Sequence, residues 1–450
     1  MSDQTLEEIA AFLLSEAKRH GASEADVVVV EGDSLSVGVR LGEIEKVQRS
    51  TARHLGLRAF AGKRSAITSS ADFSRESLAH LAEDAVALAG VTAADDVSGL
   101  PDADQLASEI PDLDLYDPEI SQLDAETATR WCLEAEAAAM DADDRITNSE
   151  GGEFGSGTHR VVYAASNGFQ AGYRTSSCSL SAVPVATQDG TMERDYWYSA
   201  KRRLSEIESP AAIGARAAER ALRRLGARQV GTAEVPVVFD PDMAASLVGH
   251  LAGAVSGHAL YRGVSFLEGE LGNKVMPDFV SIVDQGDIPG ALGSKPFDGE
   301  GLATRRTPVI DRGVLSSYLF DTYSARKLAS RSTGNASRSV GDAPGVSPTN
   351  LYLAAGDISP EDIIRSVSSG LYVTELMGFG VNPVTGDYSR GASGQWIENG
   401  ELAYPVSEIT IAGNLLEMFA TIEAVGSDLE MRRSICSPTL KIAKMTVAGS

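Results

Sequence analysis

Two histidines, His250 and His258, fall on a predicted helix of small residues that starts at residue 241. A spacing of eight residues puts both side chains on nearly the same face, but about 12 Å apart along the helix axis. A zinc ion, with Zn–N bonds of about 2 Å, cannot reach both rings. Each histidine is therefore expected to pack or to face solvent rather than to share a metal ion.

The three cysteines, Cys132, Cys178 and Cys436, are far apart and form no Cys-x-x-Cys motif. This usage is typical of a protein in a reducing cytoplasm. Cys436 with His258 could in principle form a thiol dyad. The sequence contains neither a Gly-x-Ser-x-Gly elbow nor a local cysteine-protease signature. We therefore expect Cys436 to be a semi-buried structural thiol.

A glycine-punctuated stretch, residues 370–413, separates short β-type runs and includes an Asn-Gly hairpin signal at Asn399. Its runs Glu-Leu-Met-Gly (375–378) and Gly-Asp-Tyr-Ser-Arg-Gly (386–391), with Arg-Gly-Val-Ser-Phe at 262–266, carry a specific resemblance. The chain resembles the TldD/PmbA family of bacterial and archaeal peptidases and their paired subunits. The resemblance is closer to the PmbA (TldE) branch, and it is strongest over residues 235–448.

The resemblance also says where a zinc site would lie. TldD-type members carry a His-Glu-x-x-x-His helix, and no His-Glu dipeptide occurs in this sequence. Counting back from Arg262 without gaps, the ligand positions fall on Val248 and Gly253 and the general-base position falls on Gly249. None of these side chains can bind zinc or accept a proton from water. The third family ligand would correspond to Cys436, which would then be the only ligand present. We therefore expect no cofactor in this chain and zinc in a TldD-type partner.

The resemblance implies a subunit that shapes a chamber and holds unfolded peptide while a TldD-type partner cleaves it. Sheet edges can hold an extended peptide through backbone hydrogen bonds. The expected partners are the TldD-type chain, a second copy when the chain is alone, and unfolded peptide. Two alternatives stay open: a stand-alone peptidase with a cryptic metal site or a Cys436 thiol, and a non-enzymatic regulator of the gyrase-modulator type. The peptide-binding candidates are Thr374, Glu375, Asp387, Tyr388 and Arg390; the metal or nucleophile candidates are His250, His258 and Cys436.

Composition limits the partners further. The chain has 450 residues, 43% hydrophobic content and a formal net charge of −24, and its mean hydropathy is −0.08. Nucleic acid and anionic membranes both attract basic patches, and none is visible in the sequence. No apolar run approaches the length needed to span a bilayer. We expect a cytoplasmic protein that binds neither nucleic acid nor membrane.

The order of predicted elements indicates an α+β protein. Residues 1–92 read as an N-terminal unit with a helix, an antiparallel meander and a second helix. Residues 93–120 hold nine acidic residues by position 119 and no Lys or Arg, which predicts a solvated acidic linker. Residues 121–230 read as a central α+β unit. Residues 234–450 predict a β-rich, barrel-like C-terminal domain.

Overall fold

The N-terminal half is built on one long antiparallel sheet, described with the rest of residues 5–449 in a computed structural model. The strand order is β3-β2-β1-β4-β5-β6, and β7 pairs with β5. Strands β1 and β4 pair continuously from Asp26 opposite Ala165 to Val39 opposite Gly152, so the two predicted N-terminal units share one sheet. The bounds are β1 (Glu24–Arg40), β2 (Glu43–Ala61), β3 (Arg64–Ser70), β4 (Ile146–Ala165), β5 (Gln170–Gln188), β6 (Thr191–Arg194) and β7 (Trp197–Lys201).

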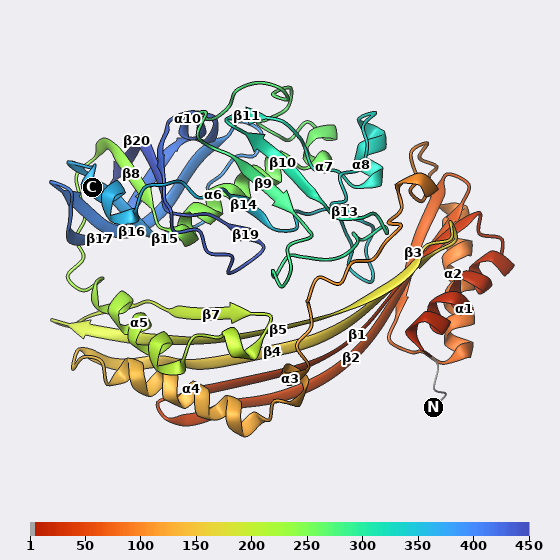
Figure 1. The fold of residues 1–450 in the computed structure, drawn as a ribbon, viewed down its shortest axis with the longest axis horizontal. Helices are drawn as coiled ribbons and strands as arrows, with labels where there is room; N and C mark the ends of the chain where they lie inside the picture. Colours follow the sequence, from red (N-terminus) through yellow and green to blue (C-terminus); the bar gives the residue numbers. More distant parts are fainter. Residues whose placement is uncertain (1–4, 450) are drawn as a thin grey trace.

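Helices cover one face of this sheet because alternate strand residues are apolar. In β1, Val27 and Val29 pack under α1 and α2, whereas Leu35 and Val37 pack under α4 and α5. Figure 1 shows α1, α2 and α4 on the face turned away from the C-terminal half. The bounds are α1 (Leu6–Arg19), α2 (Arg75–Val91), α3 (Pro118–Gln122), α4 (Ala125–Met140) and α5 (Pro210–Leu222), with 3-10 turns η1 (Ala103–Gln105) and η2 (Leu204–Glu206).

The C-terminal half contains a closed five-stranded barrel, which confirms the barrel-like prediction. The order is β17-β16-β15-β8-β20, and β20 pairs back to β17 to close the ring. Closure leaves no free edge among these strands. The bounds are β8 (Ala233–Phe239), β15 (Ser369–Met377), β16 (Asp387–Glu398), β17 (Glu401–Asn414) and β20 (Leu440–Ala448), with β18 (Ile422–Val425) added beside β20.

A second, five-stranded sheet lies beside the barrel, in the order β11-β10-β9-β14-β19. Helix α6 packs in the core that the two share, where Val248 contributes beside Phe239 of β8 and Leu351 of β14. The bounds are β9 (Ile282–Gln285), β10 (Arg306–Asp311), β11 (Val314–Leu315), β12 (Ala336–Ser337), β13 (Gly345–Val346), β14 (Leu351–Leu353), β19 (Ile435–Cys436), α6 (Pro241–Ala254), α7 (Gly257–Tyr261), α8 (Thr322–Lys327), α9 (Pro360–Arg365) and α10 (Leu415–Ala420).

Residues 93–120 differ from the predicted solvated linker. Leu100 and Leu115 are buried, and Asp95 pairs with Lys327 at 2.9 Å. Arg326 donates to the carbonyl of Leu100 at 2.7 Å. The segment thus connects the sheet to the C-terminal half, as its path between them in Figure 1 shows. Most carboxylates of the segment are exposed, as expected for an acidic linker, but its leucines are buried and several of its aspartates pair with arginines or lysines.

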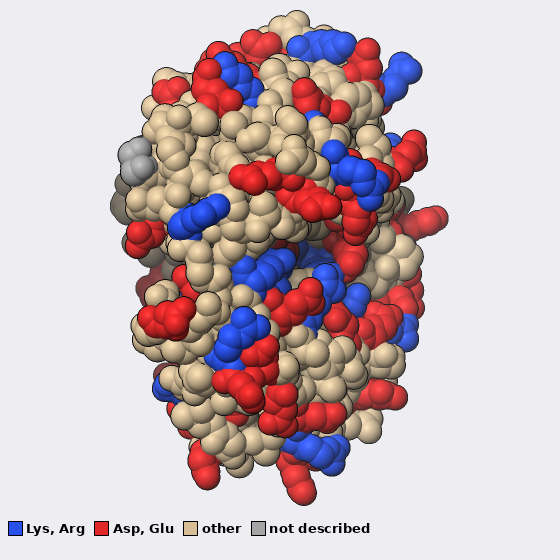
Figure 2. Space-filling view, turned by 90° about the vertical axis from the view of Figure 1, so that its left-hand side faces the viewer, with Lys and Arg blue, Asp and Glu red and all other residues tan. Residues whose placement is uncertain are grey.

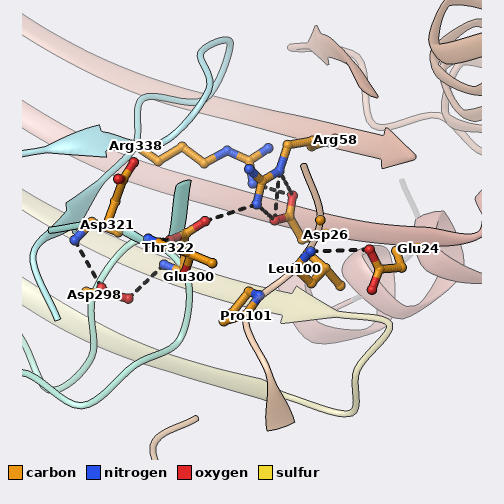
Figure 3. Close-up of polar contacts among 12 residues, drawn as sticks. Glu24, Asp26, Arg58, Leu100, Pro101, Asp298, Glu300, Asp321, Thr322 and Arg338 are labelled. Atoms are coloured by element: carbon orange, nitrogen blue, oxygen red, sulfur yellow. Dashed lines mark hydrogen bonds and ion pairs between the residues drawn. The ribbon is translucent and has the colours of Figure 1, made fainter. Parts of the chain in front are cut away.

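A buried charge cluster holds the C-terminal half against the sheet (Figure 3). Asp26 of β1 is fully buried and accepts hydrogen bonds from Arg58 of β2, Arg338 and the hydroxyl of Tyr163. The nearest nitrogens of both arginines lie 2.5 Å from the carboxylate. Burial opposes ionisation, but Arg338 and Arg58 together hold the pKa of Asp26 below its ordinary value.

Glu300 reaches the same cluster from the C-terminal half. One of its oxygens lies 3.5 Å from Arg58, and the other accepts a hydrogen bond from the backbone of Thr322 at 2.9 Å. Burial raises the pKa of Glu300 to about 7, with Arg58 acting against the shift and Asp298 and Asp321 adding to it. The contact between the two halves therefore contains a carboxyl group that titrates near neutral pH.

Candidate functional site

Helix α6 carries Val248, Gly249 and Gly253, the positions where the sequence resemblance places a zinc helix. Asp240 caps its N-terminus by accepting a hydrogen bond from the backbone of Met243 at 2.8 Å. Val248 points into the shared core and is 3% exposed. Gly249 and Gly253 face open space, because a Cβ on either would meet no atom within 4 Å. The helix therefore buries one side and presents a glycine-lined side.

A pocket of about 410 Å³ lies beside these glycines. We call it the α6 pocket. Its walls are Phe266 and residues of the loop after β15, Phe379, Val381 and Pro383, with His250 of α6 and Arg390 of β16 supplying polar groups. No Asp or Glu is among the residues that line it. The pocket is thus apolar and carries a cation without an acidic neighbour in its lining.

Three polar atoms at this site are buried and have no hydrogen-bond partner among the described residues. They are His250 Nε2, Arg390 Nε and the hydroxyl oxygen of Tyr388. The His250 ring packs edge-on against Tyr388, with ring centroids 6.0 Å apart. Burial, and then the charge of Arg390, lowers the pKa of His250, so its imidazole is neutral at pH 7. Unsatisfied groups of this kind favour a polar ligand.

The residues at the family's metal positions do not fit a zinc ion. Val248 lies in the core, and Gly249 and Gly253 have no donor atoms. His250 would be alone, whereas a catalytic zinc takes about three protein ligands. Within residues 5–449, no group of three or more His, Cys, Asp or Glu residues is placed to hold a metal ion.

His258 and Cys436 lie apart from the α6 pocket. His258 is on α7 rather than α6, and its Nε2 lies 2.9 Å from Asp321. Cys436 Sγ donates to the carbonyl of Arg433 at 3.1 Å. Burial raises the pKa of the Cys436 thiol, so it is protonated at neutral pH. The structure does not bring the three metal or nucleophile candidates together.

Cys436 instead lines a separate pocket of about 360 Å³ between α5, the start of α6 and β19. Arginines and carboxylates of its lining form pairs, such as Arg433 with Asp242 at 2.8 Å and Arg220 with Asp240 at 3.9 Å. Most charges of this second pocket are therefore paired. Arg223, which also lines it, has unsatisfied nitrogens but lies near Asp195 and Asp240, whereas the lining of the α6 pocket contains no acidic residue.

The structure places the five peptide-binding candidates in different surroundings. Arg390 lines the α6 pocket, Tyr388 is buried against His250, and Thr374 is buried in β15. Glu375 pairs with Arg224 of the N-terminal half at 2.6 Å. Asp387 is exposed and accepts a hydrogen bond from Thr385 at 2.6 Å.

Sequence reasoning missed the apolar walls of the α6 pocket, Phe266, Phe379, Val381 and Pro383. One signal was available for Phe379, which stands between two glycines in the sequence. In the structure this phenylalanine is fully exposed.

Comparison with known families gives three matches in sequence order. The model for PmbA/TldA metallopeptidase domain 1 matches residues 25–89. The central-domain model of the same family matches residues 118–225, and the C-terminal-domain model matches residues 232–449. Together the three models cover most of the chain.

Comparisons with individual proteins agree with these family matches. The chain is 40% identical to the metalloprotease PmbA of Escherichia coli O157:H7, over 98% of this chain and 94% of that protein. A solved protein from Bacteroides thetaiotaomicron, named as a candidate modulator of DNA gyrase, superposes with a TM-score of 0.92 at 28% identity, over 99% and 100% of the two chains. TldE from Thermococcus kodakarensis shares the fold, with a TM-score of 0.88 at 21% identity over 98% and 100% of the chains.

Proposed function

The chain belongs to the PmbA/TldD metallopeptidase family, as its sequence predicts, and from this premise we propose that it acts as a PmbA/TldE-like subunit. In this role it holds unfolded peptide, carries no zinc of its own, and leaves cleavage to a TldD-type partner. The observation that carries the proposal is the α6 pocket, an apolar cavity with unpaired polar groups at the place where a catalytic zinc helix would otherwise stand.

The chemistry of the pocket supports binding rather than cleavage. Peptide hydrolysis at neutral pH needs an activated water or a nucleophile with a base. Gly249 and Gly253 supply neither ligand nor base, and His250 lacks further metal-binding side chains around it. What remains at the site is space, apolar surface and hydrogen-bonding groups, which suit an extended peptide.

The test is a comparison of the isolated chain with a mixture that contains its TldD-type partner. Alone, the chain should contain no stoichiometric zinc by elemental analysis and should leave unfolded fluorogenic peptides uncleaved. Mixed, it should raise the cleavage rate above that of the partner alone, and Cys436→Ala should leave that rate nearly unchanged, because the thiol is buried and protonated.

Two outcomes would contradict this function. About one zinc per chain together with chelator-sensitive cleavage by the isolated chain would assign it a metal site of its own. Chelator-insensitive cleavage that Cys436→Ala abolishes would instead identify a thiol peptidase.

We also propose that the partners are protein and peptide rather than nucleic acid. The net charge is −24, and on the face shown in Figure 2 the basic side chains are interspersed with acidic ones. Among residues 5–449, no helix has the length and apolar character that crossing a membrane requires. A cytoplasmic location is part of the proposal, and the three cysteines support it because all are buried and free.

In the absence of a TldD-type chain, we propose that two copies pair through strand β2. Its neighbour β3 covers only Leu55 to Ala61, so one edge of residues 43–54 has no strand partner among the described residues. These residues are also exposed on both faces. Open strand edges of this length are natural sites of pairing with another chain.

A further inference from the structure

Arg390 differs from most of the partly buried arginines of this chain. Arg58 pairs with Asp26, Arg220 with Asp195, and Arg224 with Glu193. Arg390 makes no ion pair with any described residue, and its Nε atom is inaccessible to solvent and has no hydrogen-bond partner. The chain has 63 acidic residues and 39 basic ones, and few of its sheltered guanidinium groups lack a carboxylate. Arg202 donates to backbone carbonyls instead, and Arg223 also has unsatisfied nitrogens but lies near Asp195 and Asp240. A sheltered guanidinium without a carboxylate is costly unless a ligand satisfies it.

The surroundings of Arg390 fit an anion of a particular kind. A guanidinium binds a carboxylate with two parallel hydrogen bonds. His250 Nε2, also without a partner, lies beside it, and the His250 ring packs against Tyr388, whose hydroxyl is close enough to Arg390 to interact with it. A neutral imidazole with its proton on Nε2 can donate a further hydrogen bond. The site therefore offers several donors and one permanent positive charge, which match a single carboxylate.

The walls of the α6 pocket indicate what the carboxylate is attached to. Phe266, Val381 and Pro383 present apolar surface directly beside the charged group. Gly249 and Gly253 leave room for a backbone to approach the helix closely. A volume of about 410 Å³ accommodates a small part of a peptide rather than a folded domain. A carboxylate joined to an apolar side chain and a peptide backbone is the end of a peptide.

We propose that the α6 pocket recognises the free C-terminal carboxylate of a peptide whose last residue is apolar, with Arg390 pairing with the carboxylate. This inference rests on the proposed function, since it names the part of the peptide that this subunit holds. It also gives the bound peptide a direction: the C-terminal end of the peptide lies at α6, and the rest of the peptide extends away from the pocket.

The experiment uses the full chain and three unstructured peptides that carry the same N-terminal fluorophore. One ends in leucine with a free carboxylate, the second is its C-terminal amide, and the third is the amide with glutamate before the leucine. Fluorescence anisotropy gives each Kd. The free acid should bind about tenfold more tightly than either amide, as expected for one charge-assisted pair.

Variants locate the effect. Arg390→Gln should weaken binding of the free acid to the level of the amide and leave the amide unchanged. Arg331→Gln is the matched control, because that side chain is 80% exposed and distant in sequence from the pocket residues. The comparison of acid with amide on the unmodified chain needs no variant, so it decides the question even if Arg390→Gln folds poorly.

Each alternative outcome has its own meaning. Equal affinity for the free acid and the amide would overturn the carboxylate assignment and leave the peptide-holding function standing. Equal affinity for the free acid and the glutamate-containing amide would overturn the assignment to the C-terminus. Absence of binding by all three peptides would contradict the peptide-holding function itself, and with it this inference.

Discussion

Single residues decide what helix α6 can do. Val248 of this helix joins the core, whereas Gly249 and Gly253 leave open space beside it; these are the positions where the sequence resemblance expects ligands and a base. The two glycines form part of the lining of the α6 pocket. The same glycines lower the stability of the helix, since glycine in a helix interior is less favourable than alanine by about 1 kcal/mol.

Gly249→Ala is therefore expected to raise the free energy of unfolding by about 0.5–1 kcal/mol. The added methyl group meets no atom within 4 Å, and the helix gains propensity. Gly257→Ala is the contrasting control on α7, where a Cβ would lie 2.4 Å from Phe320 and 2.5 Å from Ser324. That variant should lose about 1–3 kcal/mol through overpacking. Urea titrations that rank the two variants in the opposite order would show that the α6 pocket is not open.

The sequence could predict those site residues that depend on local sequence, but not those that distant segments bring together. The positions Val248, Gly249 and Gly253 come from counting back along the sequence from Arg262, which requires no tertiary structure. In β16, strand alternation alone places Tyr388 and Arg390 on one face and Asp387 on the other. The contribution of Phe266 and Val381 could not be predicted, because the chain brings two distant loops to one wall only after the barrel has closed.

Elements were predicted better than their pairings. The helix and strand types of the N-terminal half follow from periodicity, but the union of β1 and β4 into one sheet joins residues more than 100 positions apart. Residues 93–120 show the same limit, since their partners Arg326 and Lys327 belong to another half of the molecule. Composition gives the charges of a segment but not the residues that the segment packs against.

The contact between β2 and the loop that carries Glu300 should depend on pH. The folded-state pKa of about 7 lies above the ordinary value of 4.5, and Arg58, Asp298, Asp321 and Thr322 surround the group. The folded state therefore holds this proton more tightly than the unfolded state. The stabilising contribution of Glu300 is complete below about pH 4.5 and is lost as the pH rises through 7, by about 2–3 kcal/mol at most.

Urea midpoints at pH 5 and pH 8 measure this loss. Glu300→Gln, which cannot ionise, should reduce the difference in stability between the two pH values, whereas the exposed Glu361→Gln should leave it as in the unmodified chain. The subtraction matters because other buried carboxyls titrate in the same range; burial also raises the pKa of Asp240 to about 6. An unchanged difference in Glu300→Gln would show that this carboxyl does not titrate in the folded protein near neutral pH.

At the scale of the whole molecule, the two halves differ in whether the edges of their sheets are paired. The C-terminal barrel closes on itself through β17 and β20. In the N-terminal sheet, β3 is the edge strand but covers only Leu55–Ala61 of β2, so one edge of residues 43–54 is unpaired in the described structure. The exposed side chains along this edge are sorted by charge, with Glu43 and Glu45 near its start and Arg49 further along. A strand sorted in this way complements a second copy of itself in the antiparallel direction, which is the geometry of a two-fold dimer.

We expect the isolated chain to be a dimer at tens of micromolar, as measured by light scattering, with β2 next to β2. Glu45→Arg or Arg49→Glu alone would place like charges opposite each other across the two-fold axis. Each should weaken the dimer by roughly three- to tenfold, given about 0.2–1 kcal/mol for each cross-strand pair and two such pairs per dimer. The double variant restores opposite charges and should recover most of the affinity, and Glu83→Arg on α2 is the control for a change in net charge. A monomer at these concentrations, or single and double variants that weaken the dimer additively, would place the contact elsewhere, because only a direct pairing of these two positions makes the second substitution repair the first.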